Sequence, residues 1–311
     1  MQILTADMLD TAIDWTALMR ALRHGHTLPK AQVDDVLLQQ AGRKYLVRSA
    51  WIEGLGACTK AVTIYPENSA RNPALPSVQG QVIMFDDVTG APVVLIDGPA
   101  ETRLKTAADS ALGSALLSRE TSKTLLMVGA GNMAGPLIAA HLAARPSIEK
   151  VMIWNRTEER AKTLAVELER ETGIAMQAVA DLDAAVPQAD IICSATMSQQ
   201  PLIKGDLLCE GTHLDLVGAY AADMREADDV ALKRARLFAD SFKTTLDHIG
   251  EYKIPLHRGI IQRDDVLADF YGLVAGAQGR VSDRDITLFK NGGGAHLDLM
   301  ISHHLAEFHR S

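Results

Sequence analysis

A glycine-rich turn between an apolar run and a helical pattern constrains the fold of this chain more than any other feature. The short run Leu125–Val128 leads directly into Gly129-x-Gly131-x-x-Ala134, and an apolar helical pattern follows. The first glycine permits a tight turn, the second lets a pyrophosphate approach the backbone, and Ala134 keeps helix and strand close. Unpaired N–H groups at a helix N-terminus attract phosphate. The pattern predicts a Rossmann dinucleotide-binding domain.

The end of the next predicted strand indicates which dinucleotide binds. Lys150–Trp154 is followed by Asn155, Arg156 and Thr157, with Arg160 one helical turn later. A carboxylate at this place usually binds the ribose 2′-hydroxyl of NAD, whereas an arginine accommodates the 2′-phosphate of NADP. A guanidinium can also pair with phosphate through two parallel hydrogen bonds. NADPH is therefore predicted, with NADH possible at lower preference, and a solvated polar turn is the alternative.

Composition excludes several classes of protein. The 311 residues suffice for two domains, and a net charge of −8 argues against general nucleic-acid binding. Three dispersed cysteines, Cys58, Cys193 and Cys209, indicate a reducing, cytoplasmic setting rather than a disulfide framework. No cysteine or histidine spacing predicts a metal site, and we expect neither a signal peptide nor a membrane span.

The order of the patterns predicts an α/β protein of two domains. Residues 1–115 combine helical and alternating strand patterns, as expected of an α+β substrate-binding and dimerisation domain. Residues 116–284 alternate strand and helix, as in a parallel Rossmann sheet. Residues 285–311, with a helix expected over 286–308, are predicted to return to the first domain. The alternative places this last helix on the Rossmann sheet.

Four ordered motifs resemble the ornithine cyclodeaminase/μ-crystallin family, over nearly the whole chain. They are the strand around Lys60 (Gly56–Asn68), the helix start Thr102–Leu112, the glycine turn Val128–Ala134 and the closing segment Phe289–Asp298. The resemblance implies an enzyme that binds a nicotinamide cofactor and an amino or imino acid. It also implies a homodimer through the N-terminal domain.

By this resemblance, Arg48, Lys60, Lys105 and Gly293 bind the substrate, and Lys60 is also catalytic. Clustered cations suit a carboxylate beside a reacting C=N bond. Lys60 could instead lie on the solvent face of an edge strand. Most of the family has arginine where this chain has Lys105, and Arg103 competes with Arg48 for the anion. The residues expected to bind the cofactor are Gly129, Ala130, Gly131, Asn132, Met133, Ala134, Asn155, Arg156, Thr157, Arg160, Thr196 and Lys290.

One departure from the family pattern separates two possible activities. The resemblance places Tyr220 where cyclodeaminases carry an aspartate that handles the substrate amine, and Asp223 could replace it only after a loop shift. A cyclic imine needs a hydride on carbon and a proton on nitrogen, which catalytic Tyr220 or water could donate. The expected function is NADPH-dependent reduction of Δ1-pyrroline-2-carboxylate to L-proline and of Δ1-piperideine-2-carboxylate to L-pipecolate. The alternatives are an NAD-dependent ornithine cyclodeaminase and a non-catalytic, crystallin-like NADPH-binding protein.

Overall fold

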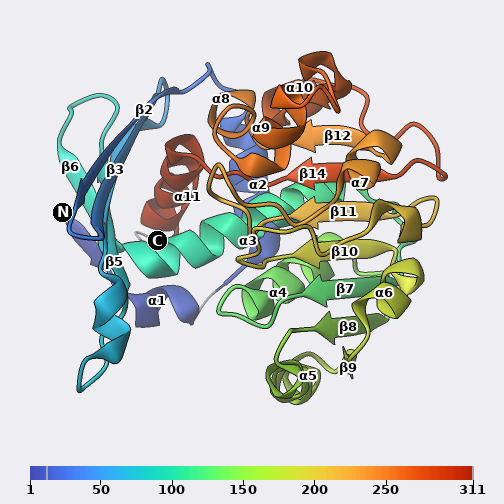
Figure 1. Ribbon diagram of the computed structural model, residues 1–311. Coiled ribbons are helices and arrows are strands. Elements are labelled where there is room, and N and C mark those ends of the chain that lie inside the picture. Colours follow the sequence, from blue (N-terminus) through green and yellow to red (C-terminus); the bar gives the residue numbers. More distant parts are fainter. Residues whose placement is uncertain (12, 310–311) are drawn as a thin grey trace. The chain divides into compact units, whose positions relative to one another are not determined.

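The computed structural model describes residues 1–11 and 13–309, which form two compact units of the predicted α/β class (Figure 1). The first unit contains residues 1–106 and the described residues from Gly294 onward. The second unit contains Ala107–Gly293. The helix α3 (Gly98–Leu117) includes the boundary between residues 106 and 107. These boundaries differ from the predicted ones at residues 115 and 285.

The first unit is built on a six-stranded sheet, in which the first strand is parallel to its neighbour and the other neighbours are antiparallel. Its elements are β1 (Gln2–Leu4), α1 (Ala6–Asp10), α2 (Trp15–Gly25), β2 (Gln32–Gln40), β3 (Arg43–Ile52), β4 (Gly56–Ile64), η1 (Pro66–Ala70), β5 (Val78–Phe85), β6 (Pro92–Asp97), the start of α3, and α11 (Ala295–Phe308). The strand order is β1-β6-β5-β4-β3-β2, so β4 is an interior strand and β2 lies at an edge.

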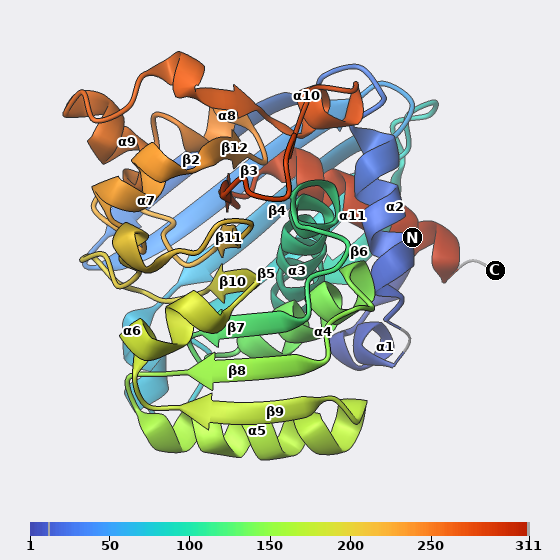
Figure 2. The same cartoon turned by 90° about the vertical axis from the view of Figure 1, so that its right-hand side faces the viewer.

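The alternation of β4 decides where its one lysine lies. Side chains alternate across a strand, and Cys58, Lys60 and Val62 all fall on the buried face of β4. Helix α11, which is buried from Ala295 to Ser302, contacts β3, β4 and α2 (Figure 2). Lys60 is therefore not on the solvent face of an edge strand.

The second unit contains an eight-stranded sheet whose neighbouring strands are all parallel. Its elements are the rest of α3, β7 (Thr124–Val128), α4 (Ala134–Ala144), β8 (Lys150–Trp154), α5 (Glu158–Thr172), β9 (Ala175–Val179), α6 (Leu182–Ala185), η2 (Val186–Gln188), β10 (Ile191–Ser194), η3 (Gly205–Leu207), β11 (His213–Leu216), α7 (Asp229–Arg234), β12 (Arg236–Ala239), α8 (Phe242–Thr245), α9 (Gly250–His257), η4 (Arg263–Asp265), β13 (Val266–Ala268), α10 (Phe270–Val274) and β14 (Thr287–Lys290).

The strand order β13-β12-β14-β11-β10-β7-β8-β9 contains a topological switch point. From β7 the chain continues to β8 on one side and later returns to β10 on the other side. Connections that leave in opposite directions open a crevice beyond the carboxyl ends of the two central strands, and ligands of such sheets bind there. The segments after β7, β8, β10 and β11 therefore frame the place where a dinucleotide is expected.

The chain after residue 284 differs from the prediction. A helix was expected from Ile286, but Thr287–Lys290 forms β14 in the middle of the parallel sheet, and α11 begins only at Ala295. A four-residue apolar run shows no helical or strand period, so the sequence pattern does not distinguish the two structures. Strand β2 was not predicted, and α3 begins at Gly98, before the segment Thr102–Leu112 that resembles a helix start.

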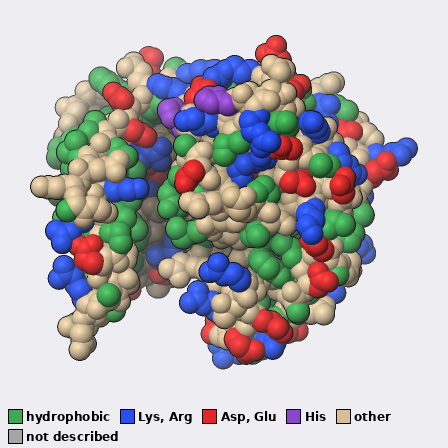
Figure 3. All heavy atoms as spheres, viewed as in Figure 1, with side chains coloured by type: hydrophobic (Ala, Val, Ile, Leu, Met, Phe, Trp, Pro, Cys, Tyr) green, Lys and Arg blue, Asp and Glu red, His purple; other side chains and the backbone are tan. Residues whose placement is uncertain are grey.

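The surface agrees with the modest charge of the chain. Acidic and basic side chains lie beside one another over α5, where Lys162 pairs with Glu158 and Glu159 (Figure 3). Among the described residues, no helix has both the length and the apolar character needed to cross a membrane. Cys58, Cys193 and Cys209 form no disulfides.

Candidate functional site

The turn after β7 has the backbone geometry that a dinucleotide requires. Gly129 has a φ of 110°, and a Cβ there would lie 2.8 Å from the carbonyl oxygen of Ala195, so another residue would be strained and crowded. A Cβ on Gly131 would meet no atom within 4 Å, and Asn132 is exposed. Helix α4 begins without a side-chain cap at Met133. The exposed backbone and the uncapped helix N-terminus fit a pyrophosphate.

The turn after β8 is tied to the glycine turn. The side-chain oxygen of Asn155 accepts a hydrogen bond from the Ala130 N–H at 3.1 Å, and its amide donates to the Thr157 carbonyl at 2.9 Å. Arg156 and Arg160 are exposed, and neither forms an ion pair within residues 1–11 and 13–309. Asn155 therefore shapes the turn, while both guanidinium groups remain available to an anion.

The other predicted residues of the second unit lie just after β10 and β11 and at or just after the end of β14. Thr196 is half-buried, whereas the side chain of Tyr220 is 62% exposed beyond the end of β11. Gly293 has a φ of 72° and donates its N–H to Asp240 at 2.5 Å. Lys290 is fully buried, and its ammonium donates to the carbonyls of Leu216 and Asn291 at 2.7 Å each. Lys290 thus connects the carboxyl ends of β11 and β14, and its predicted cofactor contact stays a prediction.

The first unit brings the predicted cations Lys60 and Lys105 into one buried cluster with two carboxylates. The ammonium of Lys60 donates to Glu101 at 2.7 Å and to Asp298 at 3.1 Å. Lys105 Nζ lies 4.0 Å from the same Asp298 oxygen, beyond hydrogen-bond distance. All four side chains are at most 6% exposed. Lys105 is therefore the cation of the cluster that is less engaged by the protein.

Electrostatics fixes the protonation state of Lys60. Burial alone would lower the pKa of Lys60, but the charges of Asp298 and Glu101 outweigh it, so this pKa is raised. Burial raises the pKa of Glu101 to about 7, against the attraction of Lys60. The pKa of Asp298 is lowered because Lys60, Lys105 and Arg48 together outweigh its burial. Lys60 stays charged at neutral pH, so it can attract an anion but is a poor proton donor.

The two arginines considered as anion ligands in the first unit, Arg48 and Arg103, each pair with an aspartate outside the buried cluster. Arg48 lies directly opposite Lys60 on β3, and its guanidinium pairs with Asp35 at 2.9 Å. Its side chain is 23% exposed. Arg103 pairs with Asp10 at 3.0 Å, which weakens the case for it as a competing anion ligand. Of the two arginines, only Arg48 borders the buried cluster.

Glu101 and Asp298 were not predicted from the sequence as site residues. A usable signal existed for Glu101, because it stands four residues before Lys105 in a helix whose buried residues are mostly small or apolar. Residues at this spacing share a helix face. Asp298 joins the cluster only because α11 folds back onto β4, a contact across most of the sequence. Local patterns do not reveal such a pairing.

A second buried cluster lies in the core of the second unit and was also missed. His141 Nε2 and Cys193 Sγ each lie 3.2 Å from the same oxygen of Asp215, and all three residues are buried. These distances and groups describe hydrogen bonds to a carboxylate. The three atoms lie close enough for a metal, but the hydrogen bonds already account for their arrangement.

Comparisons with known proteins place this geometry in a family. The model of the ornithine cyclodeaminase/mu-crystallin family matches residues 31–308. The chain belongs to this family. It is 50% identical over 297 residues to a Delta(1)-pyrroline-2-carboxylate reductase of Paracoccus denitrificans, covering 94% of this chain and 92% of that protein. Such coverage means that the resemblance drawn from four motifs extends over both units.

Two solved structures share the fold. One is Thermococcus litoralis Delta(1)-pyrroline-2-carboxylate reductase in complex with NADH and L-proline, at 29% identity and a TM-score of 0.91, covering 100% of this chain and 98% of that one. The other is an archaeal alanine dehydrogenase dimer with bound NAD, at 27% identity and a TM-score of 0.90, covering 98% and 95%. Both relatives bind a nicotinamide dinucleotide, which agrees with the geometry of the turn after β7.

Proposed function

We infer that this protein is an NAD(P)H-dependent reductase of cyclic α-imino acids, which converts Δ1-pyrroline-2-carboxylate to L-proline and Δ1-piperideine-2-carboxylate to L-pipecolate. The single observation that carries this inference is the 50% identity to a reductase of this kind over nearly the full length of both chains. The exposed glycine turn and the buried lysine cluster supply the two binding functions that the reaction needs. Tyr220, at the position where the family resemblance places the aspartate of cyclodeaminases, favours this reaction over ornithine cyclodeamination.

The roles of the side chains follow from their charges. A bound reduced nicotinamide supplies the hydride that adds to the imine carbon. We assign the substrate carboxylate to Lys105 and to the fixed positive charge of Lys60, with Arg48 beside them. The ring nitrogen gains a proton, which we assign to the exposed phenol of Tyr220. Tyr220→Phe should lower kcat by roughly 10- to 100-fold without raising the substrate KM. An unchanged kcat would assign the proton to water.

We propose NADPH as the preferred cofactor. The support is local: the three residues that follow β8 are Asn155, Arg156 and Thr157, with no carboxylate among them. Arg156 and Arg160 are exposed cations beside the predicted ribose site. A carboxylate there would repel a 2′-phosphate, whereas a guanidinium binds it. We further propose a cytoplasmic enzyme, as the cysteine usage suggests.

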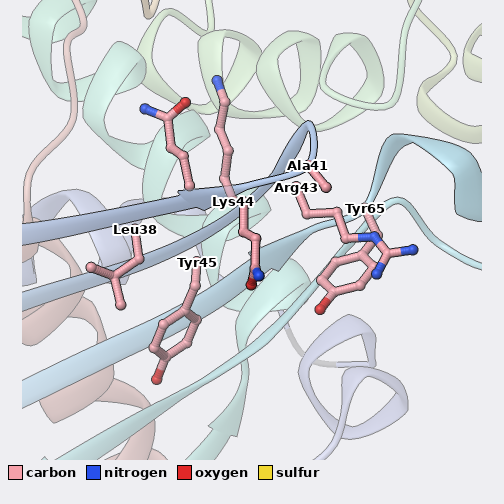
Figure 4. A pocket seen from close by; sticks show the side chains of 8 residues that line it. Leu38, Ala41, Arg43, Lys44, Tyr45 and Tyr65 are labelled. Carbon is pink, nitrogen blue, oxygen red and sulfur yellow. The ribbon is translucent and has the colours of Figure 1, made fainter.

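We propose that the protein is a homodimer that associates through β2 and β3. Leu38 and Tyr45 are paired across these strands and are 58% and 42% exposed, and Val36 on the same face is 52% exposed. Leu38, Tyr45 and Tyr65 line a groove of about 700 Å³. Their side chains are labelled in Figure 4. An exposed edge strand with apolar side chains favours association, and hydrophobic side chains lie over this unit in Figure 3.

One assay separates the proposed reductase from its alternatives. Purified protein is incubated with Δ1-pyrroline-2-carboxylate and NADPH, and in parallel with L-ornithine and NAD⁺. Loss of NADPH absorbance supports the reductase. Ammonia release from ornithine would instead establish a cyclodeaminase, although Asp223, the possible replacement for its aspartate, is exposed and accepts a hydrogen bond from Gln199 at 2.9 Å. NADPH binding without either reaction would indicate the non-catalytic protein.

A further inference from the structure

A buried glutamate connects the ends of two central strands in the second unit. Glu226 is fully buried, and one of its oxygens accepts hydrogen bonds from the hydroxyl of Ser194 at 2.6 Å and from the N–H and hydroxyl of Thr196 at 2.7 and 2.8 Å. The other oxygen accepts from the N–H groups of Gly218 and Ala219 at 2.6 and 3.2 Å. A single carboxylate thus binds the strand exits, meaning the residues at and just after the carboxyl ends of β10 and β11.

All five hydrogen bonds need an acceptor on the Glu226 side chain. Only a carboxylate has acceptors and no donor on both of its terminal atoms. Three of the hydrogen bonds come from backbone N–H groups of Thr196, Gly218 and Ala219, which cannot reverse their direction. A glutamine would place its own N–H donors against one of these sets. Charge-assisted hydrogen bonds of this kind are stronger than neutral ones. The identity of Glu226 is therefore set by the backbone that it holds.

The two strand exits are also packed without spare room. A Cβ on Gly218 would lie 2.0 Å from the Thr196 carbonyl oxygen and 2.7 Å from a carboxylate oxygen of Glu226. The backbone of Glu226 is itself held, because the buried carboxylate of Glu251 accepts from the N–H of Glu226 at 2.8 Å and of Ala227 at 3.2 Å. A change at Glu226 must therefore move both exits.

We propose that Glu226 is a positioning residue that fixes the nicotinamide-facing segments of the cofactor site. Thr196 and Gly218–Tyr220 leave the sheet on the β10–β11 side of the switch point, where a nicotinamide is expected, while the glycine turn and Arg156 lie on the β7–β8 side with the adenine half. Glu226 holds the segments after β10 and β11 in place, and it makes no hydrogen bond to the glycine turn or to Arg156 among the described residues. This inference rests on the proposed cofactor site and predicts a separation of cofactor binding from turnover.

The test compares Glu226→Gln with Glu226→Asp and with Glu210→Gln, a surface glutamate of the same unit that pairs with Arg284. In Glu226→Gln, kcat should fall about 100-fold, as small displacements of reacting groups do. The NADPH Kd should change by less than about threefold, because the glycine turn is intact. Glu226→Asp should restore part of the loss by keeping the charge, and Glu210→Gln should match the wild type.

Several results would overturn the proposal. A kcat of Glu226→Gln within about threefold of the wild type would do so, and so would an equal loss of NADPH binding and turnover. If Glu226→Gln does not fold, Ser194→Ala removes one donor and leaves no group unpaired, and an unchanged kcat in that variant contradicts the idea. If the wild type itself does not turn over, the proposed function fails separately. The emission maximum of bound NADPH then decides, because identical spectra in Glu226→Gln and wild type would refute positioning.

Discussion

Replacing Lys60 by methionine tests the buried ion cluster, because it removes the cation from between two carboxylates and keeps the side-chain volume. The ammonium is within 3.1 Å of both Glu101 and Asp298, and the exposed fractions of the three side chains are 6%, 0% and 1%. Removing one partner from a buried ion pair costs about 3–5 kcal/mol. We expect Lys60→Met to lower the free energy of unfolding of the first unit by that order.

The loss of unfolding free energy in Lys60→Met should also depend on pH. The pKa of Glu101 determines whether this loss grows or shrinks as pH rises. The pKa of Glu101 is raised by burial to about 7 in the folded protein, from an ordinary 4.5, so its contribution to stability declines as pH rises and levels off above pH 7. Without Lys60 the folded carboxyl keeps its proton beyond pH 7, and each further pH unit costs about 1.4 kcal/mol. The deficit of Lys60→Met should therefore be larger at pH 8 than at pH 6 by about 1.4 kcal/mol.

Urea unfolding followed by circular dichroism at pH 6 and pH 8 measures both quantities. Lys123→Met is the matched control, because Lys123 pairs with Glu149 on the surface with both side chains more than 60% exposed. Exposed pairs of this kind contribute little, so its urea midpoint should not move. The double variant Lys60→Met/Glu101→Leu should lose the pH dependence. If Lys60→Met and Lys123→Met unfold alike at both pH values, the electrostatic reasoning is wrong.

Three further outcomes are expected. Relative to wild type, Glu101→Gln should gain stability as pH rises from 5 to 8, because the wild-type Glu101 carboxyl contributes less to stability at each step up to pH 7. If the urea unfolding free energies of the two proteins change in parallel with pH, the pKa of about 7 for Glu101 is wrong. Arg156→Asp should raise the NADPH KM by roughly 10- to 150-fold, equal to about 1.5–3 kcal/mol, and reduce the preference for NADPH over NADH. Arg170→Asp, at the far end of α5, is the control, and an unchanged preference for NADPH in Arg156→Asp would refute the role of Arg156. Leu38→Asp should halve the mass in sedimentation, whereas Val88→Asp in the exposed β5–β6 turn should not; a monomeric wild type would refute the proposed dimer.

The second unit was the more predictable part, because its signals are local. A buried run, a glycine turn and a helix occupy consecutive residues, so Gly129 and Ala134 could be placed from the sequence, and the structure puts both where the fingerprint requires. The family resemblance added the positions of Lys60 and Lys105 and the imino acid substrate. The strand β14 was missed because Thr287–Lys290 is too short to show a period.

The missed side chains share a different property, which is that they act through long-range contacts. Asp298 reaches Lys60 across the fold of the first unit, and Glu226 accepts hydrogen bonds from Ser194 and Thr196, which precede it by 32 and 30 residues, as well as from nearby Gly218. A charged residue in an apolar segment predicts a buried partner but does not name it. Only the topology identified these partners.

The buried cluster around Lys60 and the hydrogen bonds of Glu226 constrain the chemistry jointly. The carboxylates of Asp298 and Glu101 keep Lys60 protonated, because they raise its pKa. Lys60 is therefore a poor donor of the proton that the imine nitrogen needs at neutral pH. Its charge is nevertheless fixed in place, which suits a group that must orient a carboxylate and not exchange protons with it. The proton must then come from a group that is not held in this cluster. Tyr220, exposed beyond the strand exit that Glu226 holds, meets that condition. The division between a fixed cation and a separate proton donor is what a reductase of preformed imines requires, whereas deamination of ornithine needs a carboxylate base in place of Tyr220.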